Sequence, residues 1–285
     1  MGMRTTPHTK QLLWLTDLHL DRARPESKAA LYEENRRTVA DTLLITGDIS
    51  TAKQLPLHLR EIAAASESKQ VFFVLGNHDF YGSSFAKVDS CVAGVCRSHS
   101  NLRHLGQGEI IRLDEETALV GHRGWADGKT GWGVRSFARN PDFGAIDDFR
   151  GLDRKAAFKL LGRLGSASAV YFRSVMPYAL TCYKHVIVAT HVPPMTSAAL
   201  YDGKPCDWLR QPFYCNIANG AFFHAISNIF SRNLITILCG HTHSAACVNT
   251  TPNLQIRVGG VKPGHPRSQG VFEVSSSGMR AKKSP

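Results

Sequence analysis

The feature that most constrains the fold is a series of short, continuous apolar runs, each long enough for one β-strand. Such runs lack the alternation of a half-exposed strand, and they are typical of strands buried on both faces in layered α/β proteins. The runs cover residues 12–15, 42–46, 71–75, 117–120, 185–190, 234–239, 254–258 and 270–274. We therefore expect an α/β protein built around buried strands.

Segments with the apolar spacing of helices separate many of these runs. They cover residues 26–40, 53–66, 84–97, 150–180 and 218–231. Strand and helix alternate over roughly the first hundred residues, which indicates βαβ units, whereas the less regular later strands predict a mixed sheet. No repeat or low-complexity linker interrupts the chain, so we predict one domain over residues 1–285 with an irregular loop excursion at about 122–149. Long ordered loops in compact domains are often functional.

The composition restricts the function only loosely. Lys and Arg number 34 against 23 Asp and Glu, and the resulting charge of +11 favours acidic partners such as phosphorylated molecules, nucleic acid or an anionic membrane surface. A solvated basic surface explains the same excess equally well. No apolar run is long enough for a membrane span, and seven scattered cysteines without a C-x-x-C pair predict reduced thiols. We expect a cytoplasmic protein with no membrane span.

Polar residues follow five of the apolar runs at the point where each strand should end. The five stretches read LLWLTDLHL, TLLITGDIS, VFFVLGNHD, VIVATHVPP and ITILCGHTH. Ligands of open α/β sheets bind at the carboxyl ends of the strands, so side chains far apart in sequence can meet there. Gly47, Gly76 and Gly240 allow a sharp turn or a close approach before each candidate ligand. In D-x-H and H-x-H, alternate residues of an extended strand would face one ion together.

The residues after these strands form a candidate set of metal ligands. The set is Asp17, His19, Asp48, Asn77, His191, His241 and His243. Carboxylate and imidazole without thiolate suit Mn²⁺, Fe²⁺/Fe³⁺, Zn²⁺ or Co²⁺ and are poor for Ca²⁺ or a closed structural zinc site. This is more than one ion usually accepts, and a carboxylate shared between two cations is the arrangement of two-metal phosphoester hydrolysis. We expect two divalent transition-metal ions, with Mn²⁺ as the activating ion.

The ordered series D-x-H, G-D, G-N-H-D, H and G-H-T-H resembles the calcineurin-like metallophosphoesterase superfamily. Each motif alone is weak, but the series spans residues 17–243 with every member at an expected strand end. The resemblance implies a four-layer α/β/β/α sandwich, with two mixed sheets flanked by helices. It also implies hydrolysis of phosphate monoesters or diesters, in a phosphorylated small-molecule substrate, by a metal-activated water.

The resemblance also assigns roles to individual residues. One ion would be held by Asp17, His19, Asp48 and His243. The other would be held by Asp48, Asn77, His191 and His241, with Asp48 as the bridge. His78 would contact the substrate phosphate or act as the general acid that protonates the departing alkoxide. Asp79 is expected to be the second catalytic residue beside His78, and to orient the neighbouring ligands through hydrogen bonds.

Departures from known branches of the superfamily narrow the substrate. The Ser/Thr phosphatase branch carries G-D-x-x-D-R-G where this chain reads GDISTAK, so the second Asp and the Arg are absent. This argues against a phosphoprotein phosphatase and removes the usual orienting carboxylate of His78. The lipid A precursor branch typically has Arg in place of His78. We expect selectivity to come from residues 122–149 and 201–215, with Arg123 and Arg139 as candidate phosphate-binding residues.

Two alternatives stay open at this stage. A nuclease is favoured by the charge of +11, although the basic residues are spread along the chain without a dense cluster. A catalytically silent scaffold of the same fold would usually have lost metal ligands, and every candidate ligand is present here together with His78. The sequence does not specify an oligomeric state.

Overall fold

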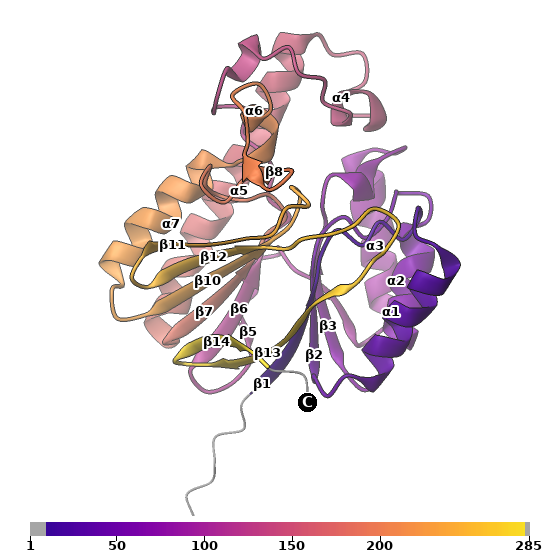
Figure 1. The fold of residues 1–285 in the computed structure, drawn as a ribbon, viewed down its shortest axis with the longest axis vertical. Coiled ribbons are helices and arrows are strands. Elements are labelled where there is room, and N and C mark those ends of the chain that lie inside the picture. Colours follow the sequence, from indigo (N-terminus) through magenta and orange to yellow (C-terminus); the bar gives the residue numbers. More distant parts are fainter. Residues whose placement is uncertain (1–9, 283–285) are drawn as a thin grey trace, which may run out of the picture.

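Two six-stranded sheets face each other in the computed structural model, which describes residues 10–282, and helices cover their outer faces (Figure 1). The ends of the predicted domain of residues 1–285 lie outside the described residues. The strand order is β14-β13-β1-β2-β3-β4 in the first sheet and β11-β12-β10-β7-β6-β5 in the second. The predicted four-layer α/β/β/α sandwich of two mixed sheets is confirmed.

The first sheet is built mainly from βαβ units. Its parallel strands are β1 (Lys10–Leu15), β2 (Thr42–Thr46), β3 (Gln70–Val74) and β4 (Leu102–His104). The helices between them are α1 (Pro25–Arg37), α2 (Leu55–Ala64) and α3 (Phe85–Ser98). The antiparallel strands β13 (Ser268–Ser275) and β14 (Gly278–Ala281) extend the sheet beyond β1. The regular alternation at the start of the sequence therefore gives the parallel half of this sheet.

The second sheet has parallel strands in its centre and antiparallel strands at its edges. The parallel strands are β6 (Thr117–Gly121), β7 (His185–Ala189), β10 (Leu234–Cys239) and β12 (Leu254–Val258). The edges are β5 (Ile111–Arg112) and β11 (Ala246–Thr251). The helices α5 (Arg154–Cys182) and α7 (Ile217–Ile229) cover the outer face (Figure 1).

The remaining short elements lie in the loops. They are η1 (His78–Phe80), η2 (Gly133–Arg135), α4 (Asp142–Ala145), α6 (Gln211–Tyr214) and the hairpin of β8 (Leu200–Tyr201) and β9 (Lys204–Pro205). Among the described helices, none combines the length and the apolar character needed to cross a bilayer.

The core explains why the strands read as continuous apolar runs. In β1, Leu12 and Trp14 pack between the two sheets, while Leu13 and Leu15 pack beneath the helices of the first sheet. A parallel strand covered on both faces has no exposed side on which polar residues would be favoured. The central parallel strands β2, β6 and β7 are buried along their whole length, which makes them a rigid support for the residues that follow them.

Two half-buried imidazoles, those of His104 and His122, predict how stability depends on pH. Burial lowers the pKa of His104 to about 4 and that of His122 to about 3. In the unfolded chain both should titrate at about pH 6.5, so the unfolded state takes up protons first and stability falls as the pH drops below that value. Between about pH 8 and about pH 5 we expect each imidazole to lower the free energy of unfolding by about 1–2 kcal/mol.

Urea denaturation across this pH range measures the effect. The variant His122→Asn keeps an acceptor for the Gly124 N–H, which donates to His122 Nδ1 at 3.0 Å. It should lose less stability on acidification than the unsubstituted protein, whatever its stability at alkaline pH. An identical fall in both proteins would contradict the assignment.

Candidate metal centre

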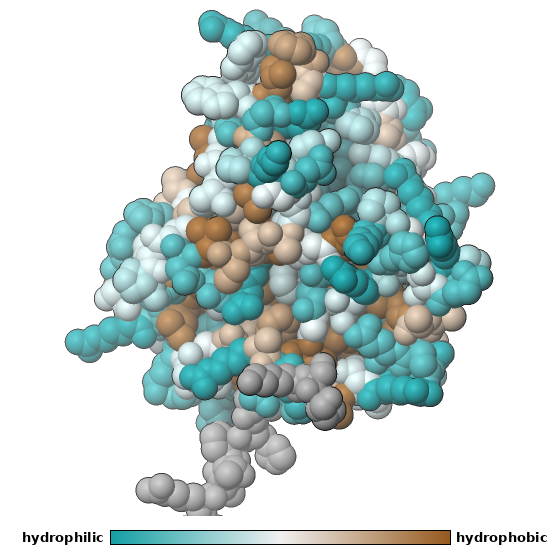
Figure 2. Space-filling view, in the orientation of Figure 1, coloured by the Kyte–Doolittle hydropathy of each residue, from teal (hydrophilic) through white to brown (hydrophobic). Residues whose placement is uncertain are grey.

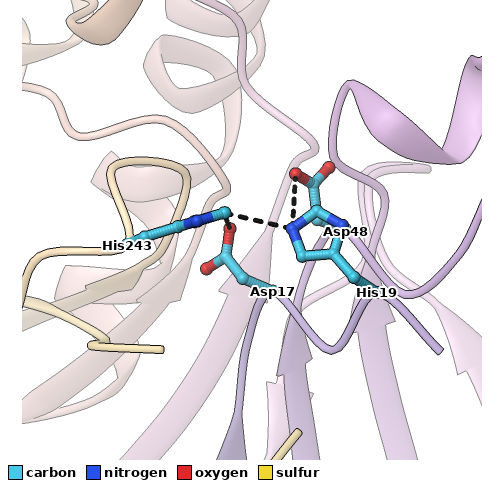
Figure 3. Close-up of side chains that lie close together, drawn as sticks. All are labelled: Asp17, His19, Asp48 and His243. Carbon is cyan, nitrogen blue, oxygen red and sulfur yellow. Dashed lines mark hydrogen bonds and ion pairs between the residues drawn. The ribbon is translucent and has the colours of Figure 1, made fainter. Parts of the chain in front are cut away.

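Four side chains from loops after three strands form a compact cluster. Ligand atoms of Asp17, His19, Asp48 and His243 all lie within 4.8 Å of one another (Figure 3). His19 Nε2 lies 3.1 Å from His243 Nε2 and 3.7 Å from Asp48 Oδ2. His243 Nε2 lies 3.4 Å from Asp17 Oδ1. Imidazole nitrogens and carboxylate oxygens that converge in this way suit a shared cation.

A second cluster lies on the other side of Asp48. His191 Nε2 lies 3.3 Å from Asp48 Oδ1 and 3.1 Å from Asn77 Oδ1. His241 Nδ1 lies 3.1 Å from the same Asn77 oxygen. Asp48 therefore presents one carboxylate oxygen to each cluster. The structure brings the seven candidate ligands together in the two groups that the resemblance implies.

Hydrogen bonds to backbone carbonyls fix the tautomers of two imidazoles. His191 Nδ1 donates to the carbonyl of Thr46 at 2.8 Å, and His241 Nε2 donates to the carbonyl of Phe213 at 2.8 Å. The proton is then held on the nitrogen that faces away from the cluster, and the other nitrogen keeps its lone pair for a cation. Both rings are thereby oriented as ligands.

The charges in the cluster also fit a cation site. Burial lowers the pKa of His19 and of His241 to about 4, so both rings are held neutral, the form that binds metal. Although burial opposes a charge on His191, the Asp48 carboxylate raises the pKa of that ring to about 10. Burial likewise opposes ionisation of Asp48, yet His191 and neighbouring imidazoles hold its pKa well below the usual value. The proton on His191 thus supplies the positive charge that the buried Asp48 carboxylate requires, as a bound cation would.

The backbone of the candidate ligands is unusual. Among the described non-glycine residues with positive φ, all but Asp202 are candidate ligands: Asp17 (48°), His19 (41°), Asp48 (53°), His241 (70°) and His243 (58°). A left-handed conformation costs an L-residue about 1–2 kcal/mol, and such strain concentrates at functional sites. The expectation that D-x-H and H-x-H continue as extended strand is wrong, because the chain turns at once. His241 and His243 consequently point into different clusters.

Two glycines make room for the ligands. A Cβ at Gly76 would lie 2.2 Å from Asp48 Oδ1 and 2.7 Å from His191 Cε1. A Cβ at Gly240 would lie 2.0 Å from Asp17 Oδ2. The predicted close approach is confirmed at both positions, because no side chain fits where the neighbouring carboxylate lies.

Asp142 is a residue in contact with the candidate site that the sequence did not reveal. It lies in α4, within the 122–149 excursion, and is only 5% exposed. Its Oδ1 accepts from Asn77 Nδ2 at 2.8 Å and from the Tyr81 hydroxyl at 2.6 Å. Anchoring the amide nitrogen turns Asn77 Oδ1 toward His191 and His241. No spacing or motif distinguishes Asp142 from other acidic residues of the excursion.

His78 and Asp79 have different surroundings. His78 lines a cleft of about 750 Å³ above the clusters, and its ring stacks on Tyr81 with 4.1 Å between centroids. Among the described residues, none hydrogen-bonds its buried Nδ1, in keeping with the absent second Asp of the Ser/Thr phosphatase motif. Asp79 is fully buried. It accepts from the backbone N–H groups of Ile49, Ser50 and Gly76 at 2.8–2.9 Å, so its carboxylate anchors the loops after β2 and β3.

The two candidate phosphate-binding arginines are separated by the fold. Arg139 lines the cleft and has no carboxylate within ion-pair distance among residues 10–282. Arg123 does not line the cleft: its guanidinium pairs with Asp89 at 2.9 Å, lies over Phe80, and lines a second cavity. Residues 201–215, the other predicted selectivity loop, contribute to the cleft wall.

Comparison with known proteins finds one matching family and solved structures of similar fold. The sequence profile described as calcineurin-like phosphoesterase matches residues 10–245. A crystal structure of a dimetal phosphatase from Danio rerio is similar in fold, with a TM-score of 0.59 and 13% identity over 94% of this chain and 93% of that chain. A 5'-nucleotidase from Candida albicans gives a TM-score of 0.49 and 10% identity over 96% of this chain and 53% of that chain. No curated protein matches the chain in sequence.

The Gly76→Ala variant tests the packing of the ligands. The added methyl group must displace Asp48 or His191, and a displacement of about 1 Å can lower activity about 100-fold. We expect lower metal content and a loss of that size in hydrolysis of an aryl phosphate. Gly94→Ala in α3, where the nearest atom would lie 3.8 Å away, is the matched control and should be slightly stabilised. Equal metal content in both variants would contradict the packing argument.

The Asp142→Ala variant tests the anchor of Asn77. Loss of a hydrogen bond that orients a ligand typically weakens metal binding 10–100-fold, so we expect about that loss for one of the two ions in a calorimetric Mn²⁺ titration. Asp147→Ala removes a surface carboxylate that pairs with Arg150 at 3.0 Å, and it should bind both ions normally. Thermal unfolding in EDTA verifies that both variants are folded. Unchanged Mn²⁺ affinity in folded Asp142→Ala would remove the anchor from the account.

Proposed function

The chain belongs to the calcineurin-like phosphoesterase family, and on that premise we propose that it is a dinuclear metal-dependent phosphoesterase. The observation that carries the proposal is the position of Asp48 between two ligand clusters, with Oδ2 toward His19 and Oδ1 toward His191. A carboxylate that faces two groups of imidazole, carboxylate and amide ligands suits a bridge between two cations.

The donor set fits transition metals. The ligand atoms are imidazole nitrogens, carboxylate oxygens and one amide oxygen, a mixture that suits Mn²⁺, Fe²⁺/Fe³⁺, Zn²⁺ or Co²⁺. When bound, the two ions would activate water and neutralise the charge of the substrate phosphate. Mn²⁺ is our choice for the activating ion in assays.

His78 is proposed as the general acid. Its backbone N–H donates to Asp48 Oδ1 at 2.9 Å, which ties the residue to the bridging carboxylate, and its side chain faces the cleft. From there the imidazole would donate a proton to the departing alkoxide oxygen. Tyr81, stacked against the ring, supports its orientation in place of a hydrogen-bonded carboxylate. Asp79 would act indirectly, by fixing the loops that carry Asp48 and His78.

The substrate would be a phosphorylated small molecule, as a monoester or a diester. The cleft of about 750 Å³ has the size of a small-molecule site. Arg139 is the cation available to a phosphate oxygen on its wall, whereas the partnered Arg123 is no longer part of the proposed site. The free cysteines among the described residues suit a reducing compartment, so a cytoplasmic location remains part of the proposal.

A nuclease is the second candidate, and the charge of +11 favours it. It predicts binding to DNA or RNA that weakens steeply with salt. A silent scaffold is disfavoured because all seven candidate ligands are present and converge.

Substitutions at Asp48 and His78 test the mechanism. Asp48→Asn should abolish hydrolysis in the presence of Mn²⁺, because the bridge loses its charge. His78→Asn should lower kcat by about 10²–10⁴-fold for an alkyl phosphate. It should lower kcat much less for p-nitrophenyl phosphate, because a nitrophenolate departs without a proton. His224→Ala, at an exposed position of α7, is the control and should behave as the unsubstituted protein.

Kinetics on the two ester types distinguish the outcomes. Equal losses on both esters would show that His78 does not protonate the leaving group. Full activity in Asp48→Asn, or in protein stripped by EDTA without added metal, would defeat the dinuclear proposal.

A further inference from the structure

An exposed apolar strip borders the cleft. It consists of Trp132 (50% exposed), Val134 (48%), Phe137 (72%) and Trp208 (67%). Phe137 also lines the cleft, and the cleft wall continues inward through Leu209 and Phe213 to His241 at the metal clusters. Phe137 thus belongs both to the strip and to the cleft that contains the candidate ligands His241 and His243.

Hydrogen bonds between two loops hold the strip in place. The Trp132 N–H donates to the Trp208 carbonyl at 3.0 Å, and the Thr130 hydroxyl donates to the Gln211 carbonyl at 2.8 Å. The Ser136 hydroxyl donates to the Leu209 carbonyl. These bonds join residues 130–136 to residues 208–211. The backbone that carries the exposed side chains is thus held by hydrogen bonds between the two loops. The side chains are exposed in the folded structure and not because the loops are unpaired.

The strip differs from other exposed apolar residues. Single exposed apolar side chains are ordinary, whereas a contiguous group marks a binding surface. The rings of Trp132 and Phe137 lie 5.9 Å apart at 75°, and Trp132 is bonded to Trp208 through the backbone. Figure 2 shows brown, hydrophobic surface among teal side chains at the end of the molecule that carries α4 and α6 in Figure 1.

The charges near the strip indicate what part of a substrate belongs where. Arg139 supplies positive charge within the cleft, and cations bound by the two ligand clusters would add to it. In the loop of residues 201–215, the Asp207 carboxylate is paired with Arg210. The four side chains of the strip are uncharged, whereas the exposed Arg135 lies between Val134 and Phe137 in the sequence and Arg154 Nε donates to the Val134 carbonyl at 3.0 Å. A phosphate is therefore favoured inside the cleft, and an apolar group is favoured along the strip.

We infer that the substrate is a phosphoester whose organic part is a long apolar chain, which lies along Phe137, Trp132 and Trp208 while the phosphate occupies the metal centre. The inference rests on the proposed phosphoesterase function. A flat nucleobase fits the strip less well, because Trp132 and Phe137 meet edge to face and offer no parallel pair of rings. Val134 adds an aliphatic surface suited to hydrocarbon.

A series of n-alkyl phosphates from butyl to octyl tests the inference, since the leaving alcohol is chemically the same throughout. Half-burial of each of the four added methylenes should raise kcat/KM about twofold, or about sixteenfold across the series. In Phe137→Ser and Trp208→Ser, this dependence on chain length should flatten. Ile229→Ser removes an equally exposed apolar side chain (76%) in α7, away from the strip, and should keep the full dependence.

The outcomes separate this inference from the proposed function. If the Mn²⁺-loaded protein hydrolyses neither p-nitrophenyl phosphate nor butyl phosphate, the proposed phosphoesterase function itself is contradicted. Hydrolysis of all alkyl phosphates with equal kcat/KM would overturn the apolar substrate alone. A preference for nucleoside monophosphates that is lost in Phe137→Ser and Trp208→Ser would replace it with base stacking.

Discussion

The carboxylate of Asp48 is the group on which the rest of this site depends. It is 1% exposed, and imidazoles approach both of its oxygens, His19 from the first cluster and His191 from the second. Burying a carboxylate is unfavourable unless positive charge or donors compensate it. Here the backbone N–H of His78 donates to one oxygen, and the remaining requirement for positive charge is what two cations would meet.

The fold supplies this arrangement at a local energetic cost. Five candidate ligands adopt left-handed backbone conformations, and Gly76 and Gly240 leave no space for a side chain beside the carboxylates. Strain of this kind persists only where the surroundings over-determine the conformation. The two sheets provide that support, because the strands that precede the ligands are almost entirely buried and end where the ligands begin. Asp79 adds to it by binding three backbone amides of the adjoining loops.

The sequence predicted what depends on local pattern and failed where tertiary contacts decide. All the apolar runs form strands, and those in the centre of the sheets, such as β2, β6 and β7, are buried on both faces. The order of the motifs indicated which side chains lie close together at the strand ends. The edge strand β4 and the hairpin of β8 and β9 are too short to show periodicity. Asp142 and Arg123 both lie in the excursion, but their roles depend on distant partners, Asn77 and Asp89, that no spacing reveals. The left-handed turns at the ligands were also not predicted, because the D-x-H and H-x-H motifs were expected to continue as extended strand.

The excursion of residues 122–149 and the loop of residues 201–215 form walls of the cleft above the candidate metal centre. Within the excursion, Asp142 orients Asn77, whereas Phe137 lines the cleft and has Trp132 beside it. The central claim is nevertheless the bridge. Its most direct test is an anomalous difference map from crystals grown with Mn²⁺. The account predicts two peaks about 3.5–4 Å apart, with one oxygen of Asp48 directed at each. A single peak, or two peaks with Asp48 bound to neither, would contradict it.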